Sequence, residues 1–249
     1  MQPKQFIIMV TSSILLTVTG SAATKIVPVI MDDIMMFVPY GDTTKTATSS
    51  ISEELANTLS YMGNEERLAY DVYNRLYDEW GTTQFTNIAT RSEIKHIEAV
   101  QALVQKYKLS DKVAFTNVDL PALGYSNTPV DEMEAGKYDI SKIQQLYDDL
   151  VAQGLASEVD ALKVGCTIEV VDIEDLDTDI AIAKTAGADD IVSTFEFLRD
   201  GSYSHYWSFD SGLKSLGVSE GCCTWEALCH PEYPQESTGQ GSGQGRGRK

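Results

Sequence analysis

The chain is short of basic residues. Lysine and arginine number 19 against 37 aspartates and glutamates in 249 residues, a formal net charge of −18 at pH 7. A protein that binds nucleic acid needs a basic face toward the phosphates, so we expect no nucleic-acid partner. The acidic excess favours a solvated surface, and it also draws cations toward the molecule.

Histidine is scarcer still, with three residues in the whole chain. The sequence shows no nucleophile elbow, phosphate-binding glycine loop or hydrolytic triad. A Ser/His/Asp enzyme would have to use His96 or His205, and both fall on the inward faces of predicted helices. The sequence therefore argues against a hydrolase of this kind.

Long apolar runs are missing except near the start of the chain. Lys4 gives a short basic start, residues 6–19 are mostly apolar, and residues 20–23 are small. This layout predicts a secretory signal peptide over residues 1–23, because the apolar run is too short for a regular membrane span. We expect a secreted or extracytoplasmic protein with no stable membrane span after cleavage. An uncleaved N-terminal anchor stays open.

Cysteine is also rare, and three of the four residues cluster near the C-terminus, at Cys222, Cys223 and Cys229. Their spacing to His230 fits no zinc pattern, so we expect a disulfide within this group, or free thiols. The fourth, Cys166, lies within a helical pattern, and we interpret it as a small core residue.

Apolar residues recur with helical spacing over residues 51–216, after a linker at 24–50 that shows no sustained period. Capping residues delimit the first helix, with Ser52 before it and Gly81 after it. The predicted segments are helices at 52–80, 87–108, 157–176 and 189–216, an irregular crossover at 109–139 and a short extra helix at 141–153. One long crossover between two helical hairpins predicts an all-α, ferritin-like four-helix bundle. Residues 217–249 form a cysteine-containing tail with an end that we expect to be disordered.

Polar residues interrupt the inward apolar stripe of every predicted long helix near its middle. These residues are Glu66 in the first helix, Glu93 and His96 in the second, Glu169 with Asp172 one position aside in the third, and Ser202 and His205 in the fourth. Buried carboxylates are costly unless they are paired or bind metal. Carboxylates with one or two imidazoles suit iron or manganese better than structural zinc. The alternative is a buried hydrogen-bonded network that only fixes helix register.

Several motifs carry a resemblance to a known family. NEERLAYDVY at 64–73, FTNIA at 85–89, SEIKH at 92–96 and GSYSH at 201–205 resemble the DUF2202 group of uncharacterised ferritin-like proteins. The resemblance covers residues 51–216. More distantly, the pattern is similar to rubrerythrin-type di-iron bundles. That similarity implies six metal ligands: Glu66, Glu93, His96, Glu169, Asp172 and His205.

The fourth helix departs from the rubrerythrin pattern. Ser202 stands where a bridging glutamate is expected, and Asp172 is the nearest acidic substitute. Gly201 weakens a helix, so we expect a local bend there that could shift His205. Paired C-x-x-C motifs are absent, so a rubredoxin-like electron-entry domain is not expected.

Two main functions follow from these observations. The first is a di-iron carboxylate protein with redox activity of a ferroxidase or peroxidase type, with manganese as an alternative metal. The second is a non-enzymatic metal-binding or interaction module that holds one ion, and a metal-free structural bundle is a third. Metal ions are the expected partners, and assembly into a homo-oligomer stays open.

Overall fold

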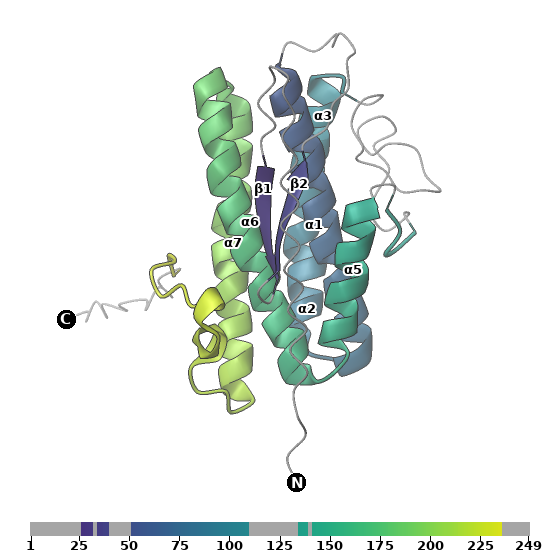
Figure 1. Ribbon diagram of the computed structural model, residues 1–249, viewed down its shortest axis with the longest axis vertical. Coiled ribbons are helices and arrows are strands. Elements are labelled where there is room, and N and C mark those ends of the chain that lie inside the picture. Colours follow the sequence, from purple (N-terminus) through teal and green to yellow (C-terminus); the bar gives the residue numbers. More distant parts are fainter. Residues whose placement is uncertain (1–25, 32–33, 40–50, 110–133, 139–140, 236–249) are drawn as a thin grey trace, which may run out of the picture.

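The computed structural model describes residues 26–31, 34–39, 51–109, 134–138 and 141–235 (Figure 1). The predicted signal peptide, most of the predicted crossover and the tail from residue 237 lie outside these ranges. The helical elements are α1 (Glu53–Trp80), α2 (Thr83–Ile88), a π-helical turn η1 (Ala89–Glu93), α3 (Ile94–Lys106), α5 (Ser141–Gly154), α6 (Glu158–Ala186) and α7 (Asp189–Ser215), followed by the short 3₁₀ turns η3 (Gly221–Thr224) and η4 (Glu226–Leu228).

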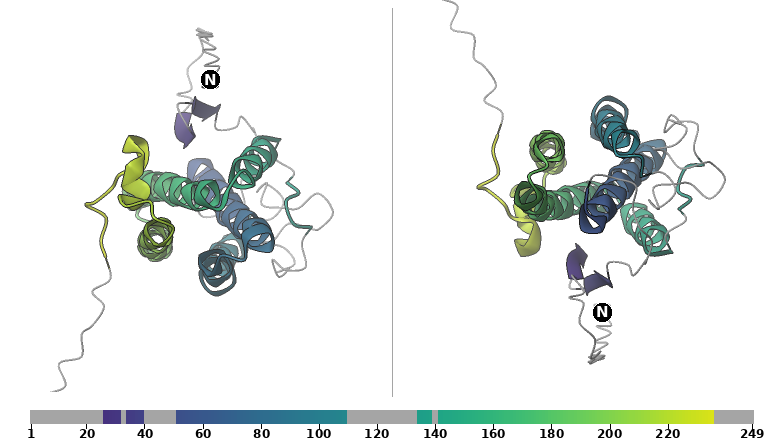
Figure 2. Two further views of the ribbon diagram at one scale, coloured as in Figure 1. Left: turned by 90° about the horizontal axis from the view of Figure 1, so that it is seen from below. Right: turned by 90° about the horizontal axis from the view of Figure 1, so that it is seen from above.

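The helices pack side by side as two hairpins with one added helix. α1 pairs with the segment α2–η1–α3, α6 pairs with α7, and α1 also packs against α6. The end-on views show these elements as neighbouring rods, with α5 set on the outside against α1 and α6 (Figure 2). The prediction of an all-α body is confirmed. Among the described residues, no helix has the length and apolar character needed to cross a bilayer.

Local signals explain where the helices begin and end. The Ser52 side chain accepts a hydrogen bond from the backbone N–H of Leu55, and Gly81 ends α1 in the left-handed region at φ 67°. Both predicted caps are confirmed, and they satisfy backbone groups that a helix end leaves open. The second helical segment begins at Thr83 rather than residue 87. α6 continues to Ala186 rather than ending near residue 176. Its apolar stripe fades there because buried aspartates replace apolar residues.

A short β-hairpin occupies part of the segment that we expected to be a linker. Strand β1 (Ile26–Met31) pairs antiparallel with β2 (Ile34–Pro39), with Ile26 opposite Pro39. Both strands are rich in isoleucine, valine and methionine, and branched apolar residues favour extended backbone. The expectation of a linker is therefore wrong over these residues, because two strands of six residues are too short to give a sustained period.

Two apolar clusters fill the helical body, and a polar layer separates them. The aromatic cluster includes Tyr73, Phe85 and Phe209, and the mainly aliphatic cluster includes Leu59 and Leu198. Along α1, α3, α6 and α7, buried polar side chains lie between members of the two clusters. We call the following residues the polar layer: Glu65, Glu66, Glu93, His96, Glu169, Asp172, Asp175, Ser202 and His205. All nine are buried between the two apolar clusters.

Two disulfides fix the segment that follows α7. Cys223 bonds to Cys229, which confirms a disulfide within the C-terminal group. Cys166 bonds to Cys222 across 56 residues of sequence. The interpretation of Cys166 as a simple core residue is therefore wrong: the side chain is fully buried, but it crosslinks α6 to η3. Its partner is so distant in sequence that local helical spacing could not reveal the bond.

Candidate metal centre

Glu93 lies between two histidines at the centre of the polar layer. Its Oε2 atom is 3.1 Å from Nδ1 of His96, and its Oε1 atom is 3.1 Å from Nδ1 of His205. The π-helical turn η1 ends at Glu93, and such turns in α-helices are frequent at functional sites. One carboxylate therefore offers an oxygen to each of two imidazoles.

A second carboxylate completes the group around each histidine. Glu66 Oε2 lies 3.0 Å from His96 Nδ1, and Glu169 Oε2 lies 3.3 Å from His205 Nδ1. The result is two triads, Glu66–Glu93–His96 and Glu93–Glu169–His205, and in each the offered ligand atoms lie within 4.8 Å of one another. Glu93 belongs to both triads. The arrangement can therefore hold two neighbouring cations with Glu93 as a bridge.

Several buried polar atoms in this layer have no hydrogen-bond partner within the described part of the chain. They are Glu65 Oε2, Glu66 Oε1, Asp172 Oδ1, Asp175 Oδ2 and His205 Nδ1. His205 Nδ1 faces two carboxylate oxygens at short range, but neither contact has hydrogen-bond geometry. A buried polar atom without a partner costs roughly 1–3 kcal/mol. Cations between these groups would satisfy them, so the residues present fit a metal.

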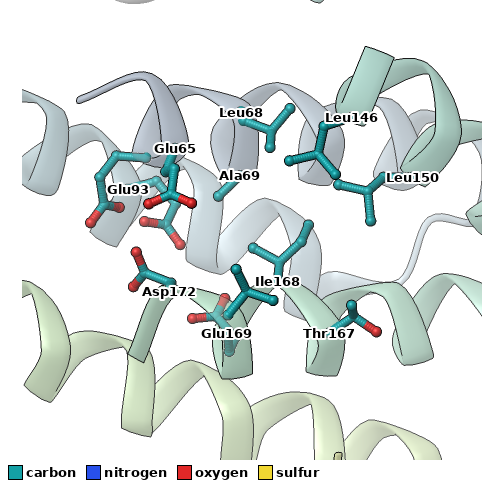
Figure 3. Close-up of a pocket in the computed structure, with 12 residues that line it drawn as sticks. Glu65, Leu68, Ala69, Glu93, Leu146, Leu150, Thr167, Ile168, Glu169 and Asp172 are labelled. Atoms are coloured by element: carbon teal, nitrogen blue, oxygen red, sulfur yellow. The ribbon is translucent and has the colours of Figure 1, made fainter. Parts of the chain in front are cut away.

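Asp172 lies in the same layer but in neither triad. Its Oδ2 atom accepts a hydrogen bond of 2.5 Å from the Ser202 hydroxyl. Its carboxylate faces those of Glu93 and Glu65 across a cavity that Glu66 and Glu169 also line (Figure 3). The serine that stands in place of the expected glutamate thus orients the aspartate of the neighbouring helix.

Gly201 makes room for His96 rather than bending α7. The helix is continuous from Asp189 to Ser215, so the expected bend is not seen. A Cβ atom at position 201 would lie 2.5 Å from Nε2 of His96, a distance at which atoms overlap. Phe197 packs edge-on against the same ring, with 5.4 Å between centroids. Glycine is therefore needed at 201 because the imidazole occupies the space of a side chain.

The family model described as "Uncharacterized protein domain (DUF2202)" matches residues 55–222 of this chain. The chain belongs to the DUF2202 family. The uncharacterized protein MJ0754 of Methanocaldococcus jannaschii is 40% identical over 167 residues, which are 67% of this chain and 79% of that protein. The crystal structure of the hypothetical protein MJ0754 matches with a TM-score of 0.57 and 36% identity, and it covers 70% of this chain and 87% of that chain.

In this DUF2202 protein all six predicted ligands are buried in one layer, and five of them make up the two triads. Their role as metal ligands stays a prediction. Tyr73 on α1 donates a hydrogen bond to Oε1 of Glu169. Tyr107 instead bonds to Asp190 at 2.8 Å, at one end of the bundle.

The sequence interpretation missed two acids of the layer. Glu65 on α1 and Asp175 on α6 are 7% and 4% exposed. Glu65 directly precedes Glu66, and adjacent helical residues point in different directions. The inward stripe that contains Glu66 therefore does not include Glu65. Asp175 could have been found, because it follows Asp172 by three residues and Asp179 follows it by four, which is helical spacing. The layer is therefore more acidic than the motif suggested.

Burial and mutual charge set the protonation of the layer without metal. Burial alone would lower the pKa of His205, yet Glu93 and Glu169 raise it to about 10. Burial, together with the charge of Glu169, raises the pKa of Asp172 to about 8. The pKa of Glu93 is lowered despite its burial, because the two histidines favour its ionised form. In the metal-free protein, protons on His205 and Asp172 balance part of the negative charge that bound cations would balance. Metal binding must release these protons, because it requires deprotonated ligands.

Proposed function

We propose that this protein is an exported, ferritin-like metalloprotein with a two-ion carboxylate centre that binds iron and supports redox chemistry. The observation that carries the proposal is Glu93, shared between two triads that each contain a histidine and a second glutamate. A buried network that only fixed helix register would need no such symmetry, and its atoms would be hydrogen-bonded to one another.

The architecture supports the ferritin-like part of the proposal. The hairpin of α1 with α2–η1–α3 is joined to the hairpin of α6 and α7 by a long connection that contains α5. The acids of the polar layer come from α1, η1 and α6, and α7 supplies His205. Ferritin-like di-metal proteins place their ligands in this way. The distant similarity to rubrerythrin-type bundles belongs to the same proposal.

Charge balance supports two divalent ions. Glu66, Glu93, Glu169 and Asp172 bring four negative charges when ionised, and two divalent cations neutralise them while both histidines stay uncharged. Oxygen ligands with imidazole suit iron and manganese. Iron bound here would supply a change of oxidation state, as in ferroxidase-like or peroxidase-like activity.

The surrounding residues hold the ligands in place. Tyr73 donates to Glu169, Ser202 donates to Asp172, and Gly201 lets His96 approach α7. Such outer contacts fix ligand orientation and commonly change metal affinity by about 10–100-fold when they are removed. The aliphatic walls of the cavity, which include Leu146 and Leu150 from α5, restrict water.

A second candidate function is a non-catalytic module that holds one ion. α7 carries Ser202 at the position where a glutamate was expected, so it offers no carboxylate to a metal there. Asp172, the nearest acid, belongs to neither triad. A centre with fewer fixed oxygens favours a single, redox-inactive ion. The number of bound ions separates the two functions.

Export is proposed on two grounds. Residues 1–23 have the pattern of a signal peptide, and the structure contains two disulfides, which persist mainly in oxidising compartments. Mass spectrometry of the protein from the culture fluid or periplasm would show a mature N-terminus near residue 24. Protein found only in the cytoplasm with reduced cysteines would contradict export.

Metal counting tests the main proposal. We expect at least two iron or manganese ions per wild-type chain, and a change in absorbance when the iron form meets oxygen or peroxide. Glu93→Gln should lose both ions, because both triads share this residue. The control Glu98→Gln removes the same charge from an exposed position on α3 and should bind as wild type. No stoichiometric metal in wild type would overturn the proposal, and one redox-silent ion would favour the second function.

A further inference from the structure

The cavity beside the triads has an acidic side and an apolar side. The carboxylates of Glu65, Glu93 and Asp172 lie toward one side, and Leu146 and Leu150 lie toward the other (Figure 3). We call the apolar side the aliphatic chamber. Its wall consists of six side chains from three helices: Leu68 and Ala69 from α1, Leu146 and Leu150 from α5, and Ile168 and Val171 from α6.

The aliphatic chamber gives water few partners. Thr167 also lines it, but the Thr167 hydroxyl already donates to the carbonyl of Lys163 at 3.0 Å. A buried water molecule needs about 2–4 polar partners, and cavities with aliphatic walls stay dry and bind apolar molecules instead. We therefore expect the aliphatic chamber to exclude water, although carboxylates lie on the other side of the cavity.

The wall that α5 contributes is held at both ends of this helix. At its C-terminal end, Nε1 of Trp80 donates to the carbonyl of Gly154 at 3.0 Å. Gly154 also allows α5 to approach α1 closely, since a Cβ atom there would lie 2.6 Å from Leu76. In its first turn, Gln144 accepts a hydrogen bond from the backbone N–H of Tyr138 at 3.1 Å. The two leucines of α5 are therefore held in place over the cavity.

The volume of the cavity limits what can occupy it. It is about 30 Å³, whereas one water-sized molecule takes roughly 10–15 Å³. A molecule of two heavy atoms therefore fits, and a substrate with more than a few heavy atoms does not fit unless the walls move. Together with the aliphatic wall, this size favours a small apolar molecule.

We propose that the aliphatic chamber binds small apolar gas molecules, dioxygen in particular, beside the two triads. The proposal rests on the proposed function for its setting, because Glu66, Glu93 and Glu169 of the triads line the same cavity, while the binding itself needs no metal. Dioxygen has two heavy atoms and forms only weak hydrogen bonds, so it loses little on leaving water. Hydrogen peroxide would give up its hydrogen bonds to water, which is costly in an apolar site.

Side chains alone separate the aliphatic chamber from the surface at three places in the described structure. Leu146, Ile168 and Val171 are 7%, 9% and 7% exposed, so each has an edge at the surface. Side chains near the surface change rotamer within picoseconds to nanoseconds. A diatomic molecule can therefore enter without displacement of a helix.

Xenon tests the aliphatic chamber, because this apolar atom occupies empty aliphatic cavities. Crystals of the full chain, freed of metal by a chelator, would be pressurised with the gas. We expect a xenon peak between Leu146, Leu150 and Ile168 in wild type. Leu150→Phe should lose the peak, because the larger ring fills the space. The control Leu150→Met keeps the volume and the apolar character and should keep the peak.

A second variant fills the aliphatic chamber from the opposite wall. Ala69→Val adds two methyl groups from α1 and should also lose the xenon peak. Thermal unfolding of each variant checks that it is folded. Because the two substitutions lie on different helices, the test holds if one of them prevents folding.

Dioxygen itself is tested by NMR of the metal-free wild-type protein in solution. Dioxygen is paramagnetic and broadens the signals of methyl groups near it, whereas nitrogen at the same pressure does not. We expect broadening at the methyl groups of Ala69, Leu146 and Leu150. Leu198 is the control, since it is buried in the other apolar cluster, and its signals should stay sharp. Equal broadening at Leu198 and in the aliphatic chamber would overturn the proposal.

The outcomes separate this inference from the proposed function. An ordered water molecule or the lack of xenon in the wild-type aliphatic chamber would overturn the inference, even if the triads bind two metal ions. Xenon at wild-type occupancy in folded Leu150→Phe and Ala69→Val would also overturn it. Xenon and dioxygen in a protein whose triads bind no metal would overturn the proposed function and leave the gas site standing.

Discussion

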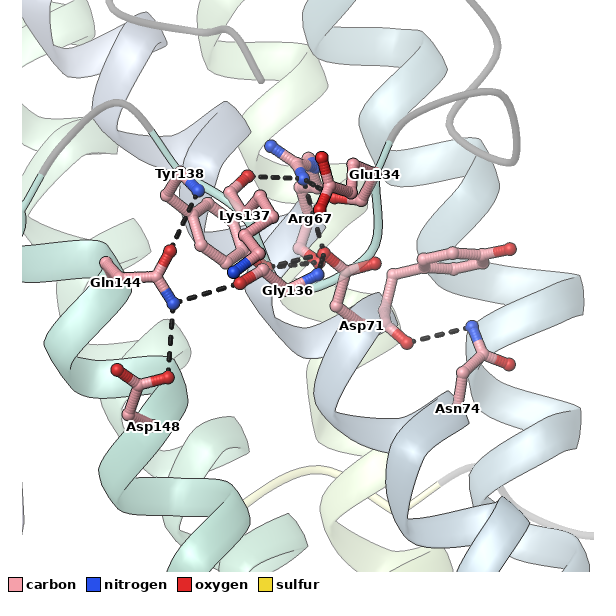
Figure 4. A network of polar contacts seen from close by, with 10 residues as sticks. Arg67, Asp71, Asn74, Glu134, Gly136, Lys137, Tyr138, Gln144 and Asp148 are labelled. Atoms are coloured by element: carbon pink, nitrogen blue, oxygen red, sulfur yellow. Dashed lines mark hydrogen bonds and ion pairs between the residues drawn. The ribbon is translucent and has the colours of Figure 1, made fainter. Parts of the chain in front are cut away.

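Two buried polar networks of this protein differ in how their charges are balanced. Around Arg67 the network is closed: its guanidinium donates to the carbonyls of Glu134 and Lys137 at 2.9 and 2.7 Å and lies beside Asp71 (Figure 4). Asp71 in turn accepts bonds from the Tyr138 hydroxyl and the Gly136 N–H. The negative charge of Asp71 is therefore balanced by Arg67 within the chain.

The polar layer is open by contrast, although its members Glu65 and Glu66 directly precede Arg67 on α1. It contains six carboxylates and two histidines, and several of its oxygens have no partner in the described structure. The hydrogen bonds of the Arg67 network hold residues 134–138 against α1, so the network stabilises the fold. The open layer has more carboxylates than cationic partners, and the proposed metal centre rests on this imbalance.

The largest expected effect is the loss of the closed network. Arg67→Met keeps the volume but leaves Asp71 buried without its positive partner. We expect a loss of about 3–5 kcal/mol in the free energy of unfolding, measured by denaturant titration. The control Arg75→Met breaks the exposed pair with Glu79 and should cost less than about 1 kcal/mol. Equal effects at the two arginines would contradict the contrast between the networks.

Metal should stabilise the protein only through the open layer. A ligand that binds only the folded state adds about 2.7 kcal/mol at a free concentration of 100 times its Kd. We therefore expect Mn²⁺ to raise the Tm of wild type and of the closed-network variant Arg67→Met. Glu93→Gln should show no such rise. A metal-dependent rise in Glu93→Gln equal to that of wild type would mean that ions bind elsewhere.

Filling the space at Gly201 should disturb one histidine. The added methyl group of Gly201→Ala overlaps the His96 ring, and overpacking of this kind costs about 1–3 kcal/mol. Metal affinity should fall as well, because His96 must move. Gly81→Ala is the control: it strains the end of α1 but has open space around it, so metal affinity should not change. Unchanged metal binding in Gly201→Ala would show that His96 is not a ligand.

The smallest effect at acid pH is expected for Asp172→Asn. The pKa of Asp172 rises from 3.8 to about 8 on folding, so between these values the metal-free folded protein holds a proton that the unfolded chain has lost. This contribution to stability is lost as pH rises toward about 8. Asparagine resembles the protonated acid, so Asp172→Asn should match wild type near pH 4 and unfold less readily than wild type near pH 7, where folded wild type must take up a proton. Asp172→Asn should flatten the fall in stability between pH 4 and 8, measured in chelator, and an unchanged slope would contradict the assignment.

Much of the fold could be predicted from local patterns. Ser52 and Gly81 mark the ends of α1 because capping needs only a few neighbouring residues. The β-hairpin and the extension of α6 were missed, since neither follows an amphipathic helical period. α6 in particular turns acids inward at Asp175 and Asp179, which a search for apolar residues passes over.

The five residues of the two triads could be predicted from the sequence, but Glu65 and Asp175 were missed, and the contacts within the site could not be predicted. Helical spacing alone places Glu93 and His96 on one face, and it places Glu66 and His205 on inward stripes. It could not show that Glu93 serves both histidines, because this depends on how far α3 and α7 are shifted relative to each other. It also misjudged Gly201, whose role appears only when the ring of His96 is seen against α7.

The sequence by itself determined the helices, their inward faces and the residue types that meet at mid-height, because these follow from a repeat of 3.6 residues within each segment. The tertiary structure alone decided which of those residues touch: Glu93 lies between two histidines, Ser202 contacts Asp172, and Cys166 bonds to Cys222. The physical reason is that these contacts join segments far apart in the chain. Their geometry is set by the packing of whole helices, and no local repeat records it.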